Sequence, residues 1–211
     1  TTQFSVVDKW GNMVSNTYSL NHSFGSGLTV TGTGILLNNT MDDFALKPGE
    51  KNSYGLVQGQ INEVVGGKRP LSSMVPTIIV LNNRAWMATG SPGGSNIITA
   101  VFQLILNRIN YQMDLATATE MPHIHSQLFP DEMKYEQGIS PDTLGLLRSM
   151  GHKVTLSRAI GSLQTVQQDC EDDNLTTCDR YGFADTRRLG AGVAVVVKPP
   201  KMVVVKPLCG N

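Results

Sequence analysis

The chain has 211 residues, of which 40% are apolar and 16% are charged. Its 17 Lys and Arg residues balance its 17 Asp and Glu residues, so we expect no binding of nucleic acid or of an anionic membrane surface. The longest apolar run, near residues 97–106, is too short to cross a bilayer. The length allows one sizeable core, and the 21 Gly residues are typical of strands joined by tight turns.

The first residue carries a functional signal. The chain opens on Thr1-Thr2 without a methionine, and a strand pattern follows over residues 4–8. We expect such a start from cleavage of a longer precursor; the alternative is that the written sequence simply begins there. A terminal threonine combines a hydroxyl nucleophile with a free α-amine, the pairing that N-terminal nucleophile hydrolases use. The α-amine has a reference pKa of about 7.7–8.0 and can act as the general base.

Two hairpins are predicted. Residues 4–8 and 13–20 have strand patterns on either side of a turn at 9–12. Residues 76–89 form the second hairpin, with the turn pair Asn82-Asn83 at its tip. The first hairpin would place Thr1 at its open end.

Loops rich in Gly and polar residues are predicted beside these hairpins. A Gly, Ser and Thr-rich stretch at 23–34 leads to a polar cluster at 38–43, which we expect to form a wall of a site. Residues 45–70 contain few apolar side chains and are predicted to form a long functional loop or lid. The turn at 90–95 contains Gly93-Gly94, whose backbone N–H groups could stabilise an oxyanion. By itself this pair is equally typical of a tight strand-to-helix connection.

Three helices are predicted in the second half. Residues 97–106 are apolar on nearly all sides, which indicates a helix buried between layers. A second helix follows Asp114 and runs to residue 120. The third begins at Ser140-Pro141, a cap followed by a proline at the first helical position, and ends at Gly151.

This order of strands, helices and strands favours an α+β fold with stacked sheets. The start of the chain contains few helices, which implies that packing elements are missing from it. We expect an upstream part of the precursor to remain bound as an obligate subunit. It would complete a four-layer sandwich.

The cysteines leave two alternatives open. Cys170 and Cys178 bracket a polar loop and could form a disulfide, as expected in an oxidising compartment. Alternatively these two residues and Cys209 are free thiols. Their spacing does not match a metal site.

Two other groups of polar residues have both a functional interpretation and a structural one. His123 and His125 alternate and could bind a metal from one strand face, but no third ligand is evident, and two polar side chains on an exposed face need no metal. The acid pairs at 42–43 and 172–173 could serve in general acid and base chemistry, or they are solvated loop residues.

Separated motifs in this chain closely resemble the small, C-terminal subunit of the γ-glutamyltranspeptidase family, in register from residue 1 to about residue 190. The motifs are Thr1-Thr2, Tyr-Ser-Leu-Asn at 18–21, Gly-Ile-Leu-Leu-Asn-Asn at 34–39, Met-Asp-Asp-Phe at 41–44, Lys-Arg-Pro-Leu-Ser-Ser-Met at 68–74 and Gly-Ser-Pro-Gly-Gly-Ser at 90–95. The resemblance implies an N-terminal nucleophile hydrolase αββα sandwich that the large subunit completes.

The resemblance also implies catalytic roles. Thr1 matches the threonine freed by autocatalytic cleavage, which forms a γ-glutamyl ester. Ser19 stands where many relatives have a threonine whose hydroxyl supports the nucleophile. Gly93 and Gly94 match the glycines of the oxyanion hole.

Substrate-binding roles follow in the same way. Asn21 and Asp43 match residues that hold the α-amino group of the substrate, for which an amide oxygen and a carboxylate are suitable acceptors. Thr40 is a departure, because relatives usually place a longer Gln or Glu there for the same purpose. A threonine does not reach equally far, so donor affinity is expected to differ.

The remaining matches concern the other end of the substrate. Ser72 and Ser73 match ligands of the α-carboxylate, and Tyr54 matches an aromatic residue on the lid. Two hydroxyls do not neutralise a carboxylate, and the family uses an arginine of the large subunit for this. That arginine is not in this chain.

These matches imply a γ-glutamyl hydrolase and transpeptidase that acts on compounds such as glutathione or glutamine without a cofactor or metal. The alternatives are a cephalosporin-type acylase on the same scaffold and a non-catalytic interaction subunit. The resemblance implies a periplasmic or secreted enzyme. We treat residues 1–211 as one domain; after residues 185–188 relatives usually end, so 193–211 form an atypical tail of unknown role.

Overall fold

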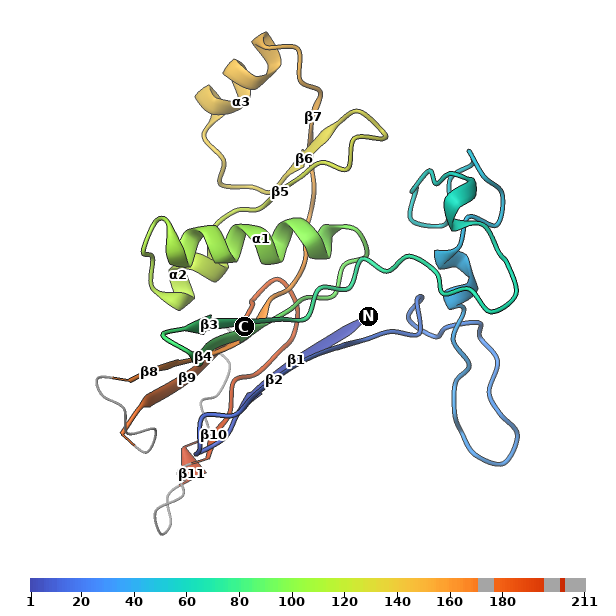
Figure 1. The fold of residues 1–211 in the computed structure, drawn as a ribbon. Helices are drawn as coiled ribbons and strands as arrows, with labels where there is room; N and C mark the ends of the chain where they lie inside the picture. The colour runs from blue at the N-terminus through green and yellow to red at the C-terminus, as the bar shows by residue number, and fades with distance from the viewer. Residues whose placement is uncertain (171–176, 196–201, 204–211) are drawn as a thin grey trace.

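The computed structural model describes residues 1–170, 177–195 and 202–203 (Figure 1). Strands β1 (Thr2–Val7) and β2 (Met13–Tyr18) pair antiparallel as the first hairpin. Its turn is fixed by Asp8, whose carboxylate accepts hydrogen bonds from the backbone N–H groups of Trp10 and Asn12 at 2.8 and 2.9 Å. Thr1 therefore lies at the open end of the hairpin, as the sequence predicts.

The main sheet has four antiparallel strands in the order β3-β4-β8-β9. Asn82 and Asn83 at the tip of the β3–β4 hairpin have φ values of 50° and 61°, the left-handed conformation that a tight hairpin turn requires. The second predicted hairpin is thus confirmed. The strands are β3 (Thr77–Leu81), β4 (Arg84–Thr89), β8 (Gln164–Asp169) and β9 (Asp179–Ala184).

The β1–β2 hairpin packs on one face of this sheet, and α1 (Asn96–Ile109) and α2 (Leu115–Glu120) cover the other (Figure 1). Hydroxyls join the two β layers, because Ser5 donates to the carbonyl oxygen of Gln164 at 2.7 Å and Ser15 to that of Thr89 at 2.6 Å. The core between helices and sheet contains Met87, Ile97, Ala100, Val101, Leu104, Leu115, Ala118 and Leu163.

Within the described chain the first predicted helix, α1, is buried on one face only. Ile97, Val101 and Leu104 are buried, but Ile98 and Phe102 on the opposite face are 50% and 57% exposed. The reason is that nothing in the described part of the chain covers that face. The layers present are therefore helix, sheet and hairpin.

A smaller sheet and the third helix form the upper lobe in Figure 1. Here α3 begins at Pro141 and is followed by Gly151 with a φ of 94°, so its predicted ends are confirmed. The elements are β5 (Ile124–His125), β6 (Met133–Tyr135), α3 (Pro141–Ser149) and β7 (Val154–Leu156).

Both histidines of the candidate metal pair are buried, which corrects the expectation of an exposed strand face. His123 Nδ1 lies 2.8 Å from the carbonyl oxygen of Ile160, and His125 Nδ1 lies 2.9 Å from Thr99 Oγ1. Within the described residues, no three His, Cys, Asp or Glu side chains are grouped as metal ligands. These histidines are packing residues of the upper lobe.

Cys170 and Cys178 form a disulfide that joins the end of β8 to the start of β9. This decides between the two alternatives for that pair, whereas Cys209 and the acid pair at 172–173 lie outside the described residues. Of the tail, β10 (Ala194–Val195) and β11 (Met202–Val203) pair antiparallel. None of the helices described is long and apolar enough to cross a membrane.

Candidate active site

Thr1 and Ser19 meet where the first hairpin opens. The two hydroxyl oxygens are 2.9 Å apart, and Ser19 Oγ also accepts the backbone N–H of Asn21 at 2.8 Å. Since that N–H can only donate, the Ser19 proton is free to point at Thr1 Oγ1. Ser19 thus fixes the position of the Thr1 hydroxyl.

The α-amine of Thr1 lies on the same residue as the candidate nucleophile. Burial lowers the pKa of this amine below its ordinary value, and the positive charge of Arg188 lowers it further. A lower pKa increases the fraction of neutral amine near pH 7, and only the neutral amine can accept a proton.

The turn between β4 and α1 supplies backbone N–H groups. Gly93 and Gly94 have φ values of 139° and 59°, where a side chain is strained. A Cβ at Gly93 would lie 3.3 Å from the Cα of Gly161, and one at Gly94 would lie 3.3 Å from the ring of Tyr54. Gly94 lines the cleft with Thr1, and Gly93 precedes it in the turn, packed against Gly161.

Ser91 ties this turn to the segment before β8. Its hydroxyl donates to the carbonyl oxygen of Pro92 and accepts the N–H of Ser162, both at 2.7 Å. Ser91 is fully buried. The turn therefore rests on residues 160–163 as a fixed support.

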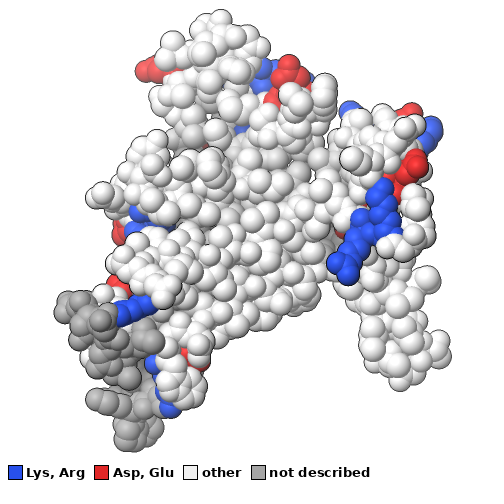
Figure 2. All heavy atoms as spheres, in the orientation of Figure 1, with Lys and Arg blue, Asp and Glu red and all other residues white. Residues whose placement is uncertain are grey.

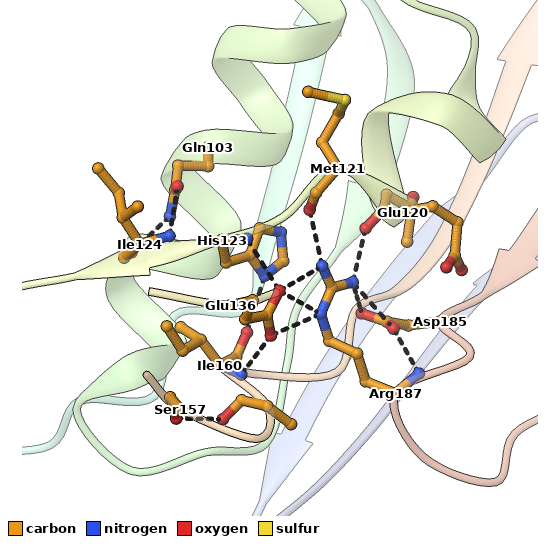
Figure 3. A network of polar contacts seen from close by, with 12 residues as sticks. Gln103, Glu120, Met121, His123, Ile124, Glu136, Ser157, Ile160, Asp185 and Arg187 are labelled. Carbon is orange, nitrogen blue, oxygen red and sulfur yellow. Dashed lines mark hydrogen bonds and ion pairs between the residues drawn. The ribbon is translucent and has the colours of Figure 1, made fainter. Parts of the chain in front are cut away.

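A buried charge network holds that support in place (Figure 3). The Arg187 guanidinium forms a bidentate contact with Glu136, at 2.8 and 2.7 Å, and contacts Asp185 at 3.1 Å. It also donates to the carbonyl oxygens of Thr119 and Met121 at 2.8 and 2.7 Å. One side chain thus joins the end of α2 to both acids.

The two acids in turn hold backbone N–H groups. Glu136 accepts from Ile160 at 2.6 Å and from His123 at 2.8 Å, and Asp185 accepts from Leu163 at 2.8 Å. Burial raises the pKa of Glu136, but the hydrogen bonds from Arg187 and the backbone outweigh it, so the pKa lies below its usual range. The sequence gives no sign of Glu136, because a single Glu in a short strand region has no pattern.

The opposite wall of the cleft carries Asn21 and Asp43. Burial and the neighbouring Asp42 raise the pKa of Asp43. Asn21 is buried, and its amide nitrogen donates to the carbonyl oxygen of Asn39 at 3.2 Å, which orients the amide oxygen as a free acceptor. Both side chains line the cleft.

Thr40 does not line the cleft, unlike the other residues expected to bind substrate. It begins the short 3-10 helix η1 (Thr40–Asp43), and its hydroxyl donates to Asn38 Oδ1 at 2.6 Å. The short side chain thus bonds its own loop. Ser72 and Ser73 do line the cleft, and Ser72 Oγ also accepts the N–H of Met74 at 3.2 Å.

The loop at 45–70, which the sequence predicts as a lid, lines the cleft with Tyr54, Leu56 and Gln58. The Tyr54 hydroxyl donates to the carbonyl oxygen of Asn21 at 2.8 Å. Beside it, Ser53 contacts the Asp42 carboxylate, and His22 Nε2 lies 3.0 Å from Ser53 Oγ. These contacts were not predicted from the sequence, because hydroxyl and imidazole side chains in a polar loop have no distinguishing pattern.

A sequence profile described as gamma-glutamyltranspeptidase matches residues 1–195. The glutathione hydrolase proenzyme of Escherichia coli is 55% identical over 187 residues, which are 89% of this chain but only 31% of that relative. The chain thus spans under a third of the length of this relative.

Solved structures agree with these sequence matches. A Helicobacter pylori γ-glutamyltranspeptidase structure superposes on 89% of this chain and 100% of that chain, with 43% identity and a TM-score of 0.84. A cephalosporin acylase from Bacillus halodurans is more distant, at 25% identity and a TM-score of 0.69 over 83% of this chain and 30% of that one. The expected fold class is confirmed, and the chain belongs to the γ-glutamyltranspeptidase family.

Proposed function

We propose that the protein containing this chain is a γ-glutamyl hydrolase and transpeptidase with Thr1 as its nucleophile. One observation carries the proposal: the Thr1 hydroxyl, held 2.9 Å from Ser19, opens into a cleft that also contains the Asp43 carboxylate and the Ser72 and Ser73 hydroxyls. An acceptor for an ammonium and donors for a carboxylate thus lie beside one nucleophile.

The reaction begins when Thr1 Oγ1 attacks the γ-carbonyl carbon of the substrate. The α-amine of Thr1 takes the hydroxyl proton, which its lowered pKa favours. The carbonyl oxygen becomes an oxyanion, and the N–H groups of Gly93 and Gly94 stabilise it. When the intermediate collapses, the C–N bond breaks, the leaving amine takes the proton from the Thr1 amine, and a γ-glutamyl ester remains on Thr1.

A second attack then releases the γ-glutamyl group. Water gives glutamate, and an amino acid or peptide amine gives a new γ-glutamyl compound. In both cases the Thr1 amine accepts the proton of the nucleophile, and the departing Thr1 oxygen receives it. No cofactor or metal takes part in these steps.

Substrate selection follows from the acceptors and donors that line the cleft. Asp43 and the Asn21 amide oxygen accept hydrogen bonds from the α-ammonium group, and the hydroxyls of Ser72 and Ser73 donate to the α-carboxylate. Tyr54 covers the bound group from the lid. Glutathione and glutamine carry both groups at the required distance from a γ-amide, so they are the expected substrates.

We propose a large subunit from the same precursor as an obligate partner. The hairpin and α1 lie on opposite sides of the main sheet, and each exposes large apolar side chains on its outer face. Figure 2 shows few charges over the centre of the molecule in that view. The word proenzyme in the name of the E. coli relative supports processing. The partner would supply the outer helical layer and a cation for the α-carboxylate. The exposed residues are Phe4, Val6, Val14, Tyr18, Ile98, Phe102 and Ile109.

The site of action is proposed to be the periplasm or the cell exterior. The disulfide between Cys170 and Cys178 supports an oxidising compartment.

The test uses the assembled two-subunit protein with two chromogenic anilides, one carrying an L-γ-glutamyl group and the other a glutaryl group that lacks the α-amine. We expect anilide release from the first, faster with a dipeptide acceptor, and little from the second. Asp43→Asn should raise the KM for the γ-glutamyl anilide and leave the KM for the glutaryl anilide unchanged. Preference for the glutaryl anilide would instead indicate the acylase alternative, and no release from either would favour a non-catalytic subunit.

A further inference from the structure

The lid places an amide side chain in the cleft. Gln58 is half-buried and lines the cavity that also contains Thr1, Asp43, Ser72 and Ser73. None of the motifs that resemble the family includes position 58. The chemistry that Gln58 presents to the cavity depends on which way its amide is turned.

The hydrogen bonds of Asn62 determine the orientation of the Gln58 amide. Asn62 Oδ1 accepts the backbone N–H of Leu71 at 3.0 Å, and Asn62 Nδ2 donates to the carbonyl oxygen of Asp43 at 2.7 Å. A backbone N–H only donates and a carbonyl only accepts, so the two ends of the Asn62 amide are not interchangeable. The second hydrogen on Nδ2 is directed at Gln58, which must turn its oxygen, Oε1, toward Asn62.

The other end of the Gln58 amide therefore carries two N–H groups for which no described residue is an acceptor. Asn62 also places these groups in the fold. Through its oxygen it holds Leu71, the residue before Ser72, so the Gln58 amide stands on the same wall as the two serine hydroxyls. This wall presents hydrogen-bond donors of three side chains and contains no cation among its lining residues.

We propose that Gln58 is a specificity-determining residue, which donates from Nε2 to the α-carboxylate of the γ-glutamyl substrate, and that Asn62 is its positioning residue. The inference rests on the proposed function. A carboxylate has about four lone-pair sites, so the two serine hydroxyls leave acceptor capacity for an amide donor. A hydrogen bond to a charged acceptor is stronger than one to a neutral acceptor, so Gln58 favours carboxylate-bearing substrates.

The test combines a change in the enzyme with a change in the substrate. Gln58→Glu replaces the two N–H groups by a carboxylate of the same shape, and Gln58→Ala removes the amide. Each assembled variant is assayed with an L-γ-glutamyl anilide and with its counterpart in which the α-carboxylate is a carboxamide. Gln60→Glu is the matched control, because it places the same charge on an exposed position of the same loop that does not line the cavity.

With the carboxylate substrate we expect Gln58→Glu to lower kcat/KM by about tenfold or more, mainly through KM, and Gln58→Ala to lower it by roughly three- to tenfold. With the carboxamide substrate Gln58→Glu should stay within about twofold, since a neutral amide accepts from Gln and donates to Glu. Gln58→Ala should lose less with this substrate than with the carboxylate substrate, because it removes a hydrogen bond to a neutral group. Gln60→Glu should leave both substrates within about twofold of the unmodified enzyme.

Equal losses on both substrates would overturn the inference, because they would show that Gln58 only shapes the lid. Unchanged KM values for the carboxylate substrate in both variants would overturn it as well, while leaving the proposed function intact. If the unmodified enzyme releases anilide from neither substrate, the proposed function is wrong and the inference falls with it.

Discussion

The two walls of the cleft are built differently. The turn at 90–95 follows β4 directly and supplies backbone N–H groups. Its fully buried Ser91 accepts a hydrogen bond from Ser162, so the segment at 160–163 supports the turn. The wall at 38–74 consists of loops and two short 3-10 helices. Apart from the buried Phe44 and Ala45, its residues are exposed or half-buried, and Ile61 is 90% exposed. Side-chain hydroxyls and amides hold that wall together.

This difference matches the two tasks of the proposed reaction. Oxyanion stabilisation depends on N–H groups that are already in place when charge develops, which needs a rigid support. Substrate entry and release need a lid whose contacts break at low cost, and exposed hydrogen bonds meet that requirement. We therefore expect changes near the turn to have large effects and changes near the lid to have small ones.

The largest effect is expected from Arg187→Ala. It removes the partner of two buried carboxylates, Glu136 and Asp185, and breaking such a pair typically costs about 3–5 kcal/mol of the free energy of unfolding. Urea unfolding of the assembled protein measures this. Arg148→Ala, at an exposed position on α3, is the control and should stay within about 0.5 kcal/mol.

The same network makes the free energy of unfolding depend on pH. The pKa of Glu136 is lowered in the folded state, so its contribution to stability is present above the ordinary carboxyl pKa and is lost as pH falls through the lowered value. The stability difference between the unmodified protein and Arg187→Ala should therefore shrink on acidification. A difference that grew instead would contradict this role.

Gly94→Ala is expected to have the next largest effect. The φ of 59° strains an alanine, and its Cβ would approach the Tyr54 ring, so the N–H groups of the turn shift. Loss of one oxyanion donor lowers kcat by about 10²–10³-fold. Steady-state kinetics on the γ-glutamyl anilide measure it. Gly145→Ala within α3, where a Cβ meets nothing within 4 Å, should leave kcat unchanged.

Arg188→Gln tests the Thr1 amine. Burial, the main cause of its lowered pKa, remains, but the positive charge is removed, so the pKa rises. The acidic limb of the kcat profile should therefore move to higher pH. A downward shift would show that the Thr1 amine is not the base that limits turnover.

Ser53→Ala is expected to have the smallest effect. It removes the hydroxyl that links Asp42 to His22 at the exposed lid tip, and such a contact contributes about 0.5–1 kcal/mol or less. The KM for the γ-glutamyl anilide should rise by no more than about fivefold, with kcat nearly unchanged. A larger loss in kcat would mean that the lid is as rigid as the turn.

Local patterns in the sequence predicted much of the fold. The Asn82-Asn83 turn, the Asp114 cap of α2 and the ends of α3 follow from backbone chemistry within a few residues. The predicted burial of α1 between two layers is seen on one face only, because the described chain does not cover its apolar outer face.

The candidate site was predicted only in part. Most of the predicted site residues, Thr1 and Ser19 among them, meet in one cleft, but roles for Gln58, Asn62 and Glu136 were not anticipated. These residues contact segments that are distant along the chain, or they lie in loops that have no periodic pattern. Neither property can be recognised from the sequence. Thr40 is the opposite case, because this position between two family motifs was expected to bind substrate but does not line the cleft.

The central claim is that Thr1 carries the γ-glutamyl group between two half-reactions. The most direct measurement mixes the assembled protein with an L-γ-glutamyl anilide, quenches it rapidly in acid, and maps added mass on its peptides by mass spectrometry. The account predicts one γ-glutamyl group on the peptide that begins at Thr1, and its loss when a dipeptide acceptor is added before the quench. Continuous anilide release with no adduct on Thr1, or an adduct on another residue, would contradict it.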